Sequence, residues 1–319
     1  MIIDFGSRPP LPAFNPSNAH HMANYDRVYS ASSESARADI VGEDKTKALD
    51  AYLKAYDDND VRYVVIHAKD VETTFGVKIS NEDVAAFCRE HGKRFLGFAG
   101  VDPHKGFKAI EDLKRAVNDL GLRGLNLQCF EHCIPINDKK FYPLYAKCIE
   151  LDIPVGIHAS INFSTRTLME YGRPLALDEV MVHFPELKAV AIPPGWPWVQ
   201  ELIGVAWRHK NVHIGLTPVR PKYLEVPESG YGPLVQYGNS VLQDRMIFGT
   251  SYPLQPIQRT IEETKALSLK PEVQHKWMYA NAARLLGLDG CWPTLNAQRS
   301  TNGPGPDHGT PSCFEARRP

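Results

Sequence analysis

The feature that most constrains this chain is a repeated alternation of short apolar segments with amphipathic segments. Runs rich in β-branched residues, such as Val61–Ile66, predict buried strands. The segments between them carry apolar residues at helical spacing, as in Val199–Trp207 (VQELIGVAW). Such alternation is typical of a parallel sheet covered by helices. The predicted strands are Ile2–Phe5, Val61–Ile66, Phe95–Val101, Gly124–Leu127, Val155–His158, Ala189–Ile192, Val212–Leu216 and Met246–Phe248.

Eight strands, each followed by a helix or a long loop, predict an α/β fold of the (β/α)8 TIM-barrel type over residues 1–288. The chain then becomes rich in Pro, Gly and Ser without periodicity, so residues 289–319 are predicted to form an irregular tail. Residues 11–45 are predicted to be a long loop with helical pieces across one mouth of the barrel. In such barrels, catalysis takes place at the carboxyl ends of the strands.

Charge and hydropathy argue against several classes of partner. A formal net charge of −1 favours neither nucleic acid nor an anionic membrane surface. No apolar run approaches the roughly 20 residues that a membrane helix needs. The first residues, MIIDFGSRPP, lack the basic and apolar regions of a signal peptide. We therefore expect a cytoplasmic protein.

Five segments in a fixed order resemble the amidohydrolase-related family of metal-dependent barrels, which includes aminocarboxymuconate semialdehyde and resorcylate decarboxylases. They are RFLGFAGVDPHKG (94–106), FYPLYAKCIELDIPVGIHAS (141–160), HFPELKAVAIPPGWPW (183–198), IFGTSYPL (247–254) and YANAARLLGL (279–288). The resemblance implies an amidohydrolase-like barrel that holds a divalent metal. The family's ligands are a His-x-His after strand one, a His ending strand five and an Asp ending strand eight. A further His after strand six commonly assists.

This chain departs from that ligand set at almost every position. Gly6 and Arg8 stand where the first two histidines belong. Pro193 replaces the histidine after strand six, and Ser251 replaces the aspartate after strand eight. Only His158 remains. One imidazole beside a cationic arginine is a poor site for a divalent ion, so the sequence predicts that this chain binds no metal.

Six residues at predicted strand ends or in the following loops are the candidate site. His158 is the candidate general base, and Arg8 is the candidate catalytic anchor for a substrate carboxylate. The candidate substrate-binding residues are Gln128, His67, Trp196 and Ser251. Structural alternatives stay open, because His158, His67 and Gln128 could serve local bonding. Arg8 could instead reach solvent or a partner chain, and Trp196 could anchor an interface.

The leading functional hypothesis is a metal-free accessory subunit of a metal-dependent paralogue that acts on a small carboxylated substrate. The chain resembles the ligand-poor subunit of the two-chain oxygenase that hydroxylates 2-aminoisobutyrate. A partner chain would then carry Mn, Fe or Zn, and a hetero-oligomer or a homo-oligomer is expected. The expected interface is an exposed aromatic patch that combines the mouth loop of residues 11–45, including Phe14, Tyr25 and Tyr29, with Trp196 and Tyr252.

Two alternatives stay open. The first is a metal-independent hydrolase or decarboxylase that uses Arg8 and His158. The second is a metalloenzyme with rearranged ligands drawn from His20, His21, His67 and His158.

Overall fold

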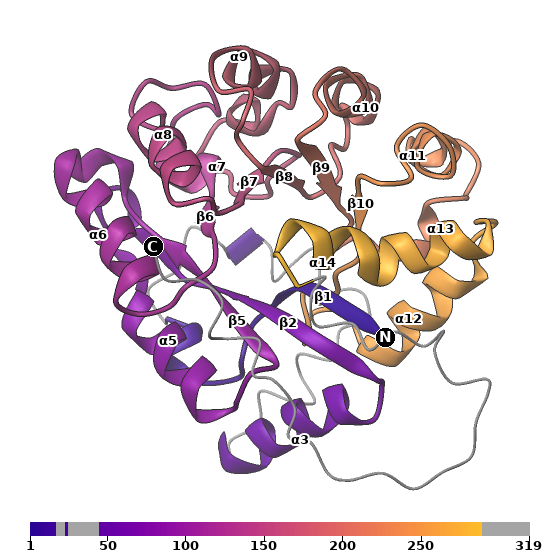
Figure 1. Cartoon of the computed structure of the whole chain (residues 1–319), viewed down its shortest axis with the longest axis horizontal. Helices are drawn as coiled ribbons and strands as arrows, with labels where there is room; N and C mark the ends of the chain where they lie inside the picture. The colour runs from indigo at the N-terminus through magenta and orange to yellow at the C-terminus, as the bar shows by residue number, and fades with distance from the viewer. Residues whose placement is uncertain (17–22, 25–44, 289–319) are drawn as a thin grey trace, which may run out of the picture.

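The strands of this computed structural model form one parallel sheet that curls into a barrel (Figure 1). The structure describes residues 1–16, 23–24 and 45–288, so the predicted tail lies outside the described residues. The sheet order is β1-β2-β5-β6-β7-β8-β9-β10. The strands are β1 (Ile2–Ser7), β2 (Val61–His67), β5 (Phe95–Gly100), β6 (Leu125–Leu127), β7 (Val155–His158), β8 (Ala189–Ile192), β9 (Val212–Gly215) and β10 (Met246–Ile247). The predicted TIM barrel is confirmed.

The barrel closes between β1 and the segment that follows β10. The Phe5 N–H donates to the Phe248 carbonyl at 3.1 Å, and the Arg8 N–H donates to the Tyr252 carbonyl at 2.9 Å. Ser7 and Tyr252 form an isolated parallel bridge between the same two segments. Closure satisfies backbone groups that would otherwise stand on open sheet edges.

Helices surround the sheet and bury the outward side chains of the strands in the larger apolar cluster. They are α3 (Lys45–Asp57), α5 (Asn81–Glu90), α6 (Phe107–Asn118), α8 (Tyr142–Glu150), α9 (Leu175–His183), α10 (Val199–Arg208), α11 (Gly232–Gly238) and α12 (Ile257–Ala266). Helix α5 begins at an N-cap in which Ser80 Oγ accepts from the Asp83 N–H at 3.0 Å. Within the described part of the chain, none of the helices is long and apolar enough to cross a bilayer.

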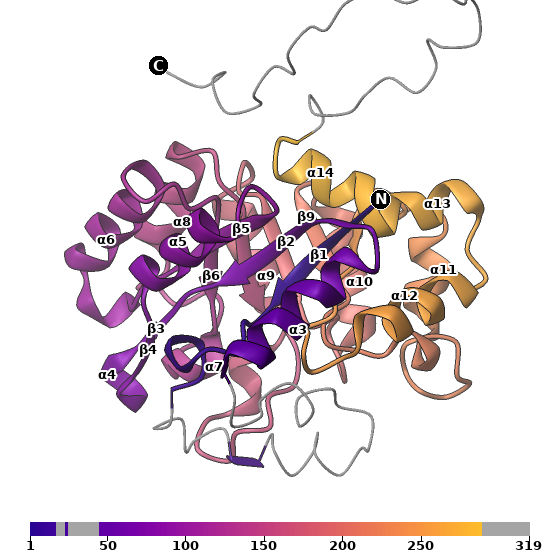
Figure 2. The ribbon, with the colours of Figure 1, turned by 90° about the horizontal axis from the view of Figure 1, so that it is seen from below.

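The amino-terminal end of the barrel is sealed by the last described helices. These are α13 (Pro271–His275), a π-helical turn (Lys276–Ala280) and α14 (Asn281–Leu285), which cross that end of the barrel (Figures 1 and 2). A second apolar cluster there joins inward-facing strand residues such as Phe5 and Phe98 to Ala282 of α14. The two phenylalanine rings meet edge to face, 5.4 Å between centroids. The opposite end therefore holds the space for a site.

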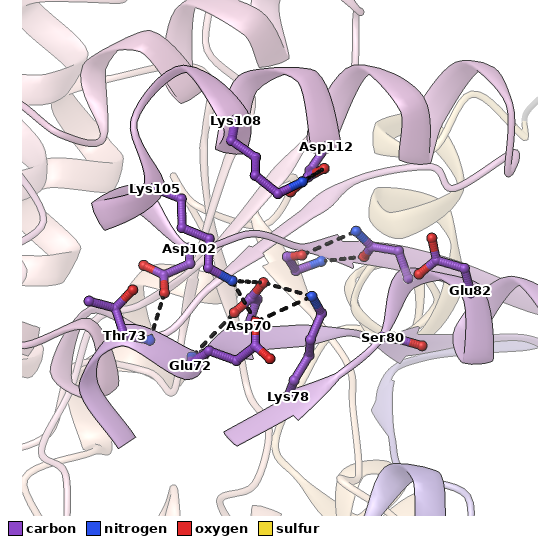
Figure 3. Close-up of polar contacts among 12 residues, drawn as sticks. Asp70, Glu72, Thr73, Lys78, Ser80, Glu82, Asp102, Lys105, Lys108 and Asp112 are labelled. Atoms are coloured by element: carbon purple, nitrogen blue, oxygen red, sulfur yellow. Dashed lines mark hydrogen bonds and ion pairs between the residues drawn. The ribbon is translucent and has the colours of Figure 1, made fainter. Parts of the chain in front are cut away.

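A hairpin that the sequence pattern did not predict follows β2. It consists of β3 (Lys69–Val71), the short helix α4 (Glu72–Phe75) and β4 (Val77–Ile79). Ion pairs fix it to the loop before α6: Lys105 Nζ lies 2.7 Å from Asp70 Oδ2 and 2.6 Å from Glu72 Oε2 (Figure 3). Lys78 Nζ lies 3.2 Å from the same Asp70 oxygen. The hairpin thereby places Lys69 at the carboxyl ends of the strands.

Candidate functional site

A cavity of about 860 Å³ lies at the carboxyl ends of the strands. The described parts of the predicted mouth loop contribute Asn15, Pro16 and Ala23 to its wall. All six predicted site residues line this one cavity, although they come from six different strand ends and loops. They are Arg8, His67, Gln128, His158, Trp196 and Ser251. The fold brings the candidates together, and their individual roles stay predictions.

The family's metal-ligand positions do not offer a donor set for a divalent cation. Gly6 has no side chain, and a Cβ there would lie 3.2 Å from Thr217 Cγ2, so the neighbouring space is occupied. Arg8 is a cation and Pro193 has no donor atom, which leaves His158 as the single imidazole. Among the described residues, His, Cys, Asp and Glu side chains nowhere gather in threes that could hold a metal ion.

The alternative of a metal site built from rearranged histidines can be examined at only two of its four residues. His20 and His21 lie outside the described residues. His67 and His158 both line the cavity. These two imidazoles alone fall short of the three protein ligands that catalytic zinc sites use.

His158 is the last residue of β7 (Val155–His158), and it lines the cavity. The residue is 6% exposed, and its ring packs on Phe130 with centroids 4.5 Å apart. Burial lowers the pKa of His158 to about 4, although the nearby Glu131 carboxylate acts in the opposite direction. Its Nδ1 atom is buried without a hydrogen-bond partner in the described part of the chain. His158 is therefore neutral at pH 7.

A cation and a second neutral imidazole face the same cavity from β1 and β2. Arg8 is exposed on the wall just after β1. Burial, and then the charge of Arg8, lower the pKa of His67 to about 4. His67 Nε2 and Thr217 Oγ1 are buried, again with no partner among the described side chains and backbone. A positive charge beside polar atoms with unused hydrogen-bonding capacity is suited to a carboxylate.

A buried ion pair that sequence analysis missed completes the polar lining. Lys69 Nζ lies 2.7 Å from Glu131 Oε1, and the two side chains are 9% and 2% exposed. Glu131 belongs to the short helix α7 (Cys129–His132), and its backbone carbonyl accepts from Thr74 Oγ1 at 2.6 Å. Isolated charges are costly to bury, so a buried pair on a cavity wall suggests a functional role. The charged residue directly after the apolar run VVIHA was the available signal.

The remaining candidates are held by the surrounding structure while they line the cavity. Gln128 Nε2 donates to Asn126 Oδ1 at 2.9 Å. Trp196 is 37% exposed, and its backbone carbonyl accepts from Ser160 Oγ at 2.8 Å. Ser251 adopts a left-handed backbone conformation with φ of 55°.

The predicted exposed aromatic patch is wrong at Phe14 and Tyr252, while its members Tyr25 and Tyr29 lie outside the described residues. Phe14 is 2% exposed and packs edge to face on Phe87, 5.6 Å between centroids. Tyr252 is 5% exposed and stacks on Tyr52 at 5.4 Å. Both rings bury apolar area inside the molecule, which is where large aromatic side chains contribute most to stability.

Asp4 anchors the loop after β10 to β1. Its carboxylate accepts from the Thr250 N–H at 2.8 Å, from Thr250 Oγ1 at 2.5 Å and from Tyr56 Oη at 3.2 Å. Burial raises the pKa of Asp4 to about 6 in spite of these hydrogen bonds. Tyr56 Oη also lies 2.6 Å from Ser7 Oγ, and Ser7 lines the cavity. This network supports the two segments that carry Arg8 and Ser251.

Comparison with known proteins shows the family to which this barrel belongs. A model of the amidohydrolase family matches residues 24–288, so the chain belongs to that family. A gamma-resorcylate decarboxylase from Rhizobium sp. (strain MTP-10005) is 25% identical over 247 residues, which cover 66% of this chain and 76% of the relative.

Two solved structures share the architecture. An uncharacterised TIM-barrel protein from Bordetella bronchiseptica is 28% identical with a TM-score of 0.75, covering 91% of this chain and 99% of that one. A dihydroxybenzoic acid decarboxylase from Polaromonas sp. JS666, solved with bound manganese, is 16% identical with a TM-score of 0.62, covering 90% and 97%. The second likeness shows the fold alone.

Proposed function

We propose that this protein is a decarboxylase of a small carboxylated molecule, with chemistry carried by its own side chains instead of a metal ion. The observation that carries the proposal is one cavity that joins a cation, two neutral imidazoles and a buried ion pair. The same cavity has lost the family's ligand positions. The decarboxylase relative supports a reaction at a carboxylate.

Arg8 would bind the substrate carboxylate. A guanidinium forms two parallel hydrogen bonds to a carboxylate, and Arg8 stands on the cavity wall next to His67. Apolar residues supply part of the wall, among them Phe130, Ile157, Ile192, Trp196 and Pro218. A volume of about 860 Å³ accommodates a one-ring substrate between such walls.

The two histidines would handle the proton. In the free protein, burial keeps His158 and His67 neutral. A bound carboxylate brings a negative charge close to them, which raises the pKa of each imidazole. A histidine that takes up a proton in this way can deliver it to the carbon that loses CO₂.

The manganese of the Polaromonas structure is not carried over to this chain, because the donor atoms here do not suit it. The accessory-subunit hypothesis finds no support in relatives that are themselves decarboxylases. A partner chain and a cytoplasmic location stay untested predictions.

The test is CO₂ release by protein dialysed against a chelator. The substrates are 2,6-dihydroxybenzoate and a cyclic 3-oxo acid, 2-oxocyclohexane-1-carboxylate. Turnover should survive chelation, and Arg8→Gln should lower kcat/KM by roughly 10- to 100-fold, the value of a charge-assisted bond. Arg115→Gln, on the outer surface of α6, is the matched control. Turnover that appears only after manganese is added would contradict the proposal.

A further inference from the structure

Loss of CO₂ from a carboxylate requires an acceptor for the electron pair of the broken carbon–carbon bond. A metal ion can be that acceptor, but the donor set at this cavity does not fit one. An iminium formed between a lysine and a ketone is the alternative that a protein can supply alone. This inference therefore rests on the proposed decarboxylase function.

We infer that Lys69 forms a Schiff base with the substrate, and that the substrate is a 3-oxo carboxylic acid. Lys69 is the only lysine among the described residues that line the cavity. Its side chain is 9% exposed, and Ile79 and Phe130 belong to the same wall. A lysine amine that has given up its proton to a neighbouring base is a nucleophile for carbonyl groups.

The hairpin that carries Lys69 is fixed by other lysines. Lys105 and Lys78 neutralise Asp70 and Glu72 on its outer side, as Figure 3 shows. The Lys69–Glu131 pair is separate from this network and faces the cavity. The structure thus uses two lysines to hold the hairpin and directs a third toward the substrate.

Glu131 is placed to move the protons that imine formation requires. Its Oε1 lies 2.7 Å from Lys69 Nζ, which is a direct hydrogen bond. The Thr74 hydroxyl holds the backbone of Glu131, so the carboxylate is presented from a fixed turn. Glu131 is also close enough to His158 for its charge to act on that imidazole.

The reaction balances without an oxidant or a reductant. Lys69 passes a proton to Glu131, and Nζ adds to the carbonyl carbon. Loss of water then gives an iminium. The bond to the carboxyl carbon breaks, CO₂ leaves, and the electron pair moves to the iminium nitrogen to give an enamine. The enamine carbon takes a proton from His158, which has acquired it from solvent on substrate binding, and water hydrolyses the resulting iminium to free the ketone and the lysine.

Reductive trapping tests this inference on the full chain. The chain is incubated with 2-oxocyclohexane-1-carboxylate and cyanoborohydride, digested, and examined by peptide mass spectrometry. The peptide that holds Lys69 should gain one cyclohexyl group, to about one per chain, and excess non-reactive benzoate should suppress the gain. Lys188, whose side chain is 35% exposed and pairs with Asp152, reports background labelling.

Lys69→Arg is the matched variant, because it keeps a cation beside Glu131 but forms no iminium. It should retain the unfolding temperature of the wild type and lose trapping, with kcat lowered by roughly a thousandfold or more. CO₂ release from the 3-oxo acid without a Lys69 adduct, or with Lys69→Arg fully active, would overturn the inference and leave the proposed function standing. Absence of CO₂ release from every substrate would contradict the proposed function, and absence of an adduct as well would overturn both.

Discussion

The two ends of this barrel are built from the same strands and differ in almost every property. At the amino-terminal end, strand side chains such as Phe5 and Phe98 pack on α14 in a continuous apolar cluster. At the carboxyl end, the same sheet surrounds a cavity whose wall includes buried polar atoms of His67, His158 and Thr217 that have no partner among the described residues. One end is closed by apolar packing, and the other keeps buried polar atoms at a cavity wall.

The difference separates stability from function along the barrel axis. Apolar burial stabilises in proportion to the area removed from water, so the sealed end supplies stability. Buried polar atoms without partners, and a buried ion pair, cost stability unless they serve another purpose. Substitutions at the sealed end should therefore lower the free energy of unfolding. Removal of an unpartnered polar group at the cavity should raise the free energy of unfolding and weaken substrate binding.

The largest effect is expected from Phe5→Ala at the sealed end. Phe5 is 1% exposed and contacts Phe98, so truncation leaves a cavity and should lower the free energy of unfolding by about 3–5 kcal/mol. Urea denaturation measures the change. Phe107→Ala is the control, because that ring is 74% exposed and its loss should change stability by less than about 0.5 kcal/mol. Equal effects of the two variants would refute the distinction.

An intermediate effect is expected from pH, through His158 at the cavity. Its pKa is about 4 when folded and 6.5 in the unfolded chain, so the unfolded state binds more protons between these values. Stability contributed by neutral His158 is present above pH 6.5 and is lost as the pH falls toward 4. The loss should be on the order of 3 kcal/mol, and His158→Gln should remove it. Denaturation midpoints across this range give the measurement.

Asp4 is the opposite-sign control for the same experiment. Its pKa is raised from 3.8 to about 6 by burial, so the folded state binds more protons between those values. Stability from this group is present below about pH 4 and is lost as the pH rises through 6. Asp4→Asn should therefore gain on the wild type as the pH rises, while His158→Gln gains as the pH falls. Parallel profiles for the two variants would show that burial does not set these pKa values.

The smallest effect is expected from Thr217→Val at the cavity. Removal of a buried hydroxyl that lacks a partner should raise the free energy of unfolding by about 1–2 kcal/mol and weaken substrate binding. Thr250→Val is matched in chemistry, but its hydroxyl donates to Asp4 at 2.5 Å, so this variant should be destabilised. Chemical denaturation measures the stability of the two variants, and CO₂-release assays measure their substrate binding through KM. A destabilised Thr217→Val would mean that the hydroxyl is satisfied in the native protein.

Much of the candidate site could be predicted because barrel topology converts position in a strand into position in space. Arg8, His67, Gln128 and His158 stand at or directly after the ends of parallel strands, and the carboxyl ends of such strands meet around one opening. Lys69 was missed because it lies in a hairpin inserted after β2. A strand of three residues is too short to show a periodic pattern in the sequence.

The sequence by itself determined the β/α alternation, the barrel and the absence of imidazole or carboxylate side chains at Gly6, Pro193 and Ser251. Each of these depends on local periodicity or on the identity of a single residue. Only the tertiary structure decided that Lys69 meets Glu131 from 62 positions away. It also decided that Tyr252 packs inward. Burial disfavours the charged form of both groups, so it lowers the pKa of His158 and raises the pKa of Asp4. These properties arise from contacts and desolvation among distant segments, which local sequence patterns do not encode.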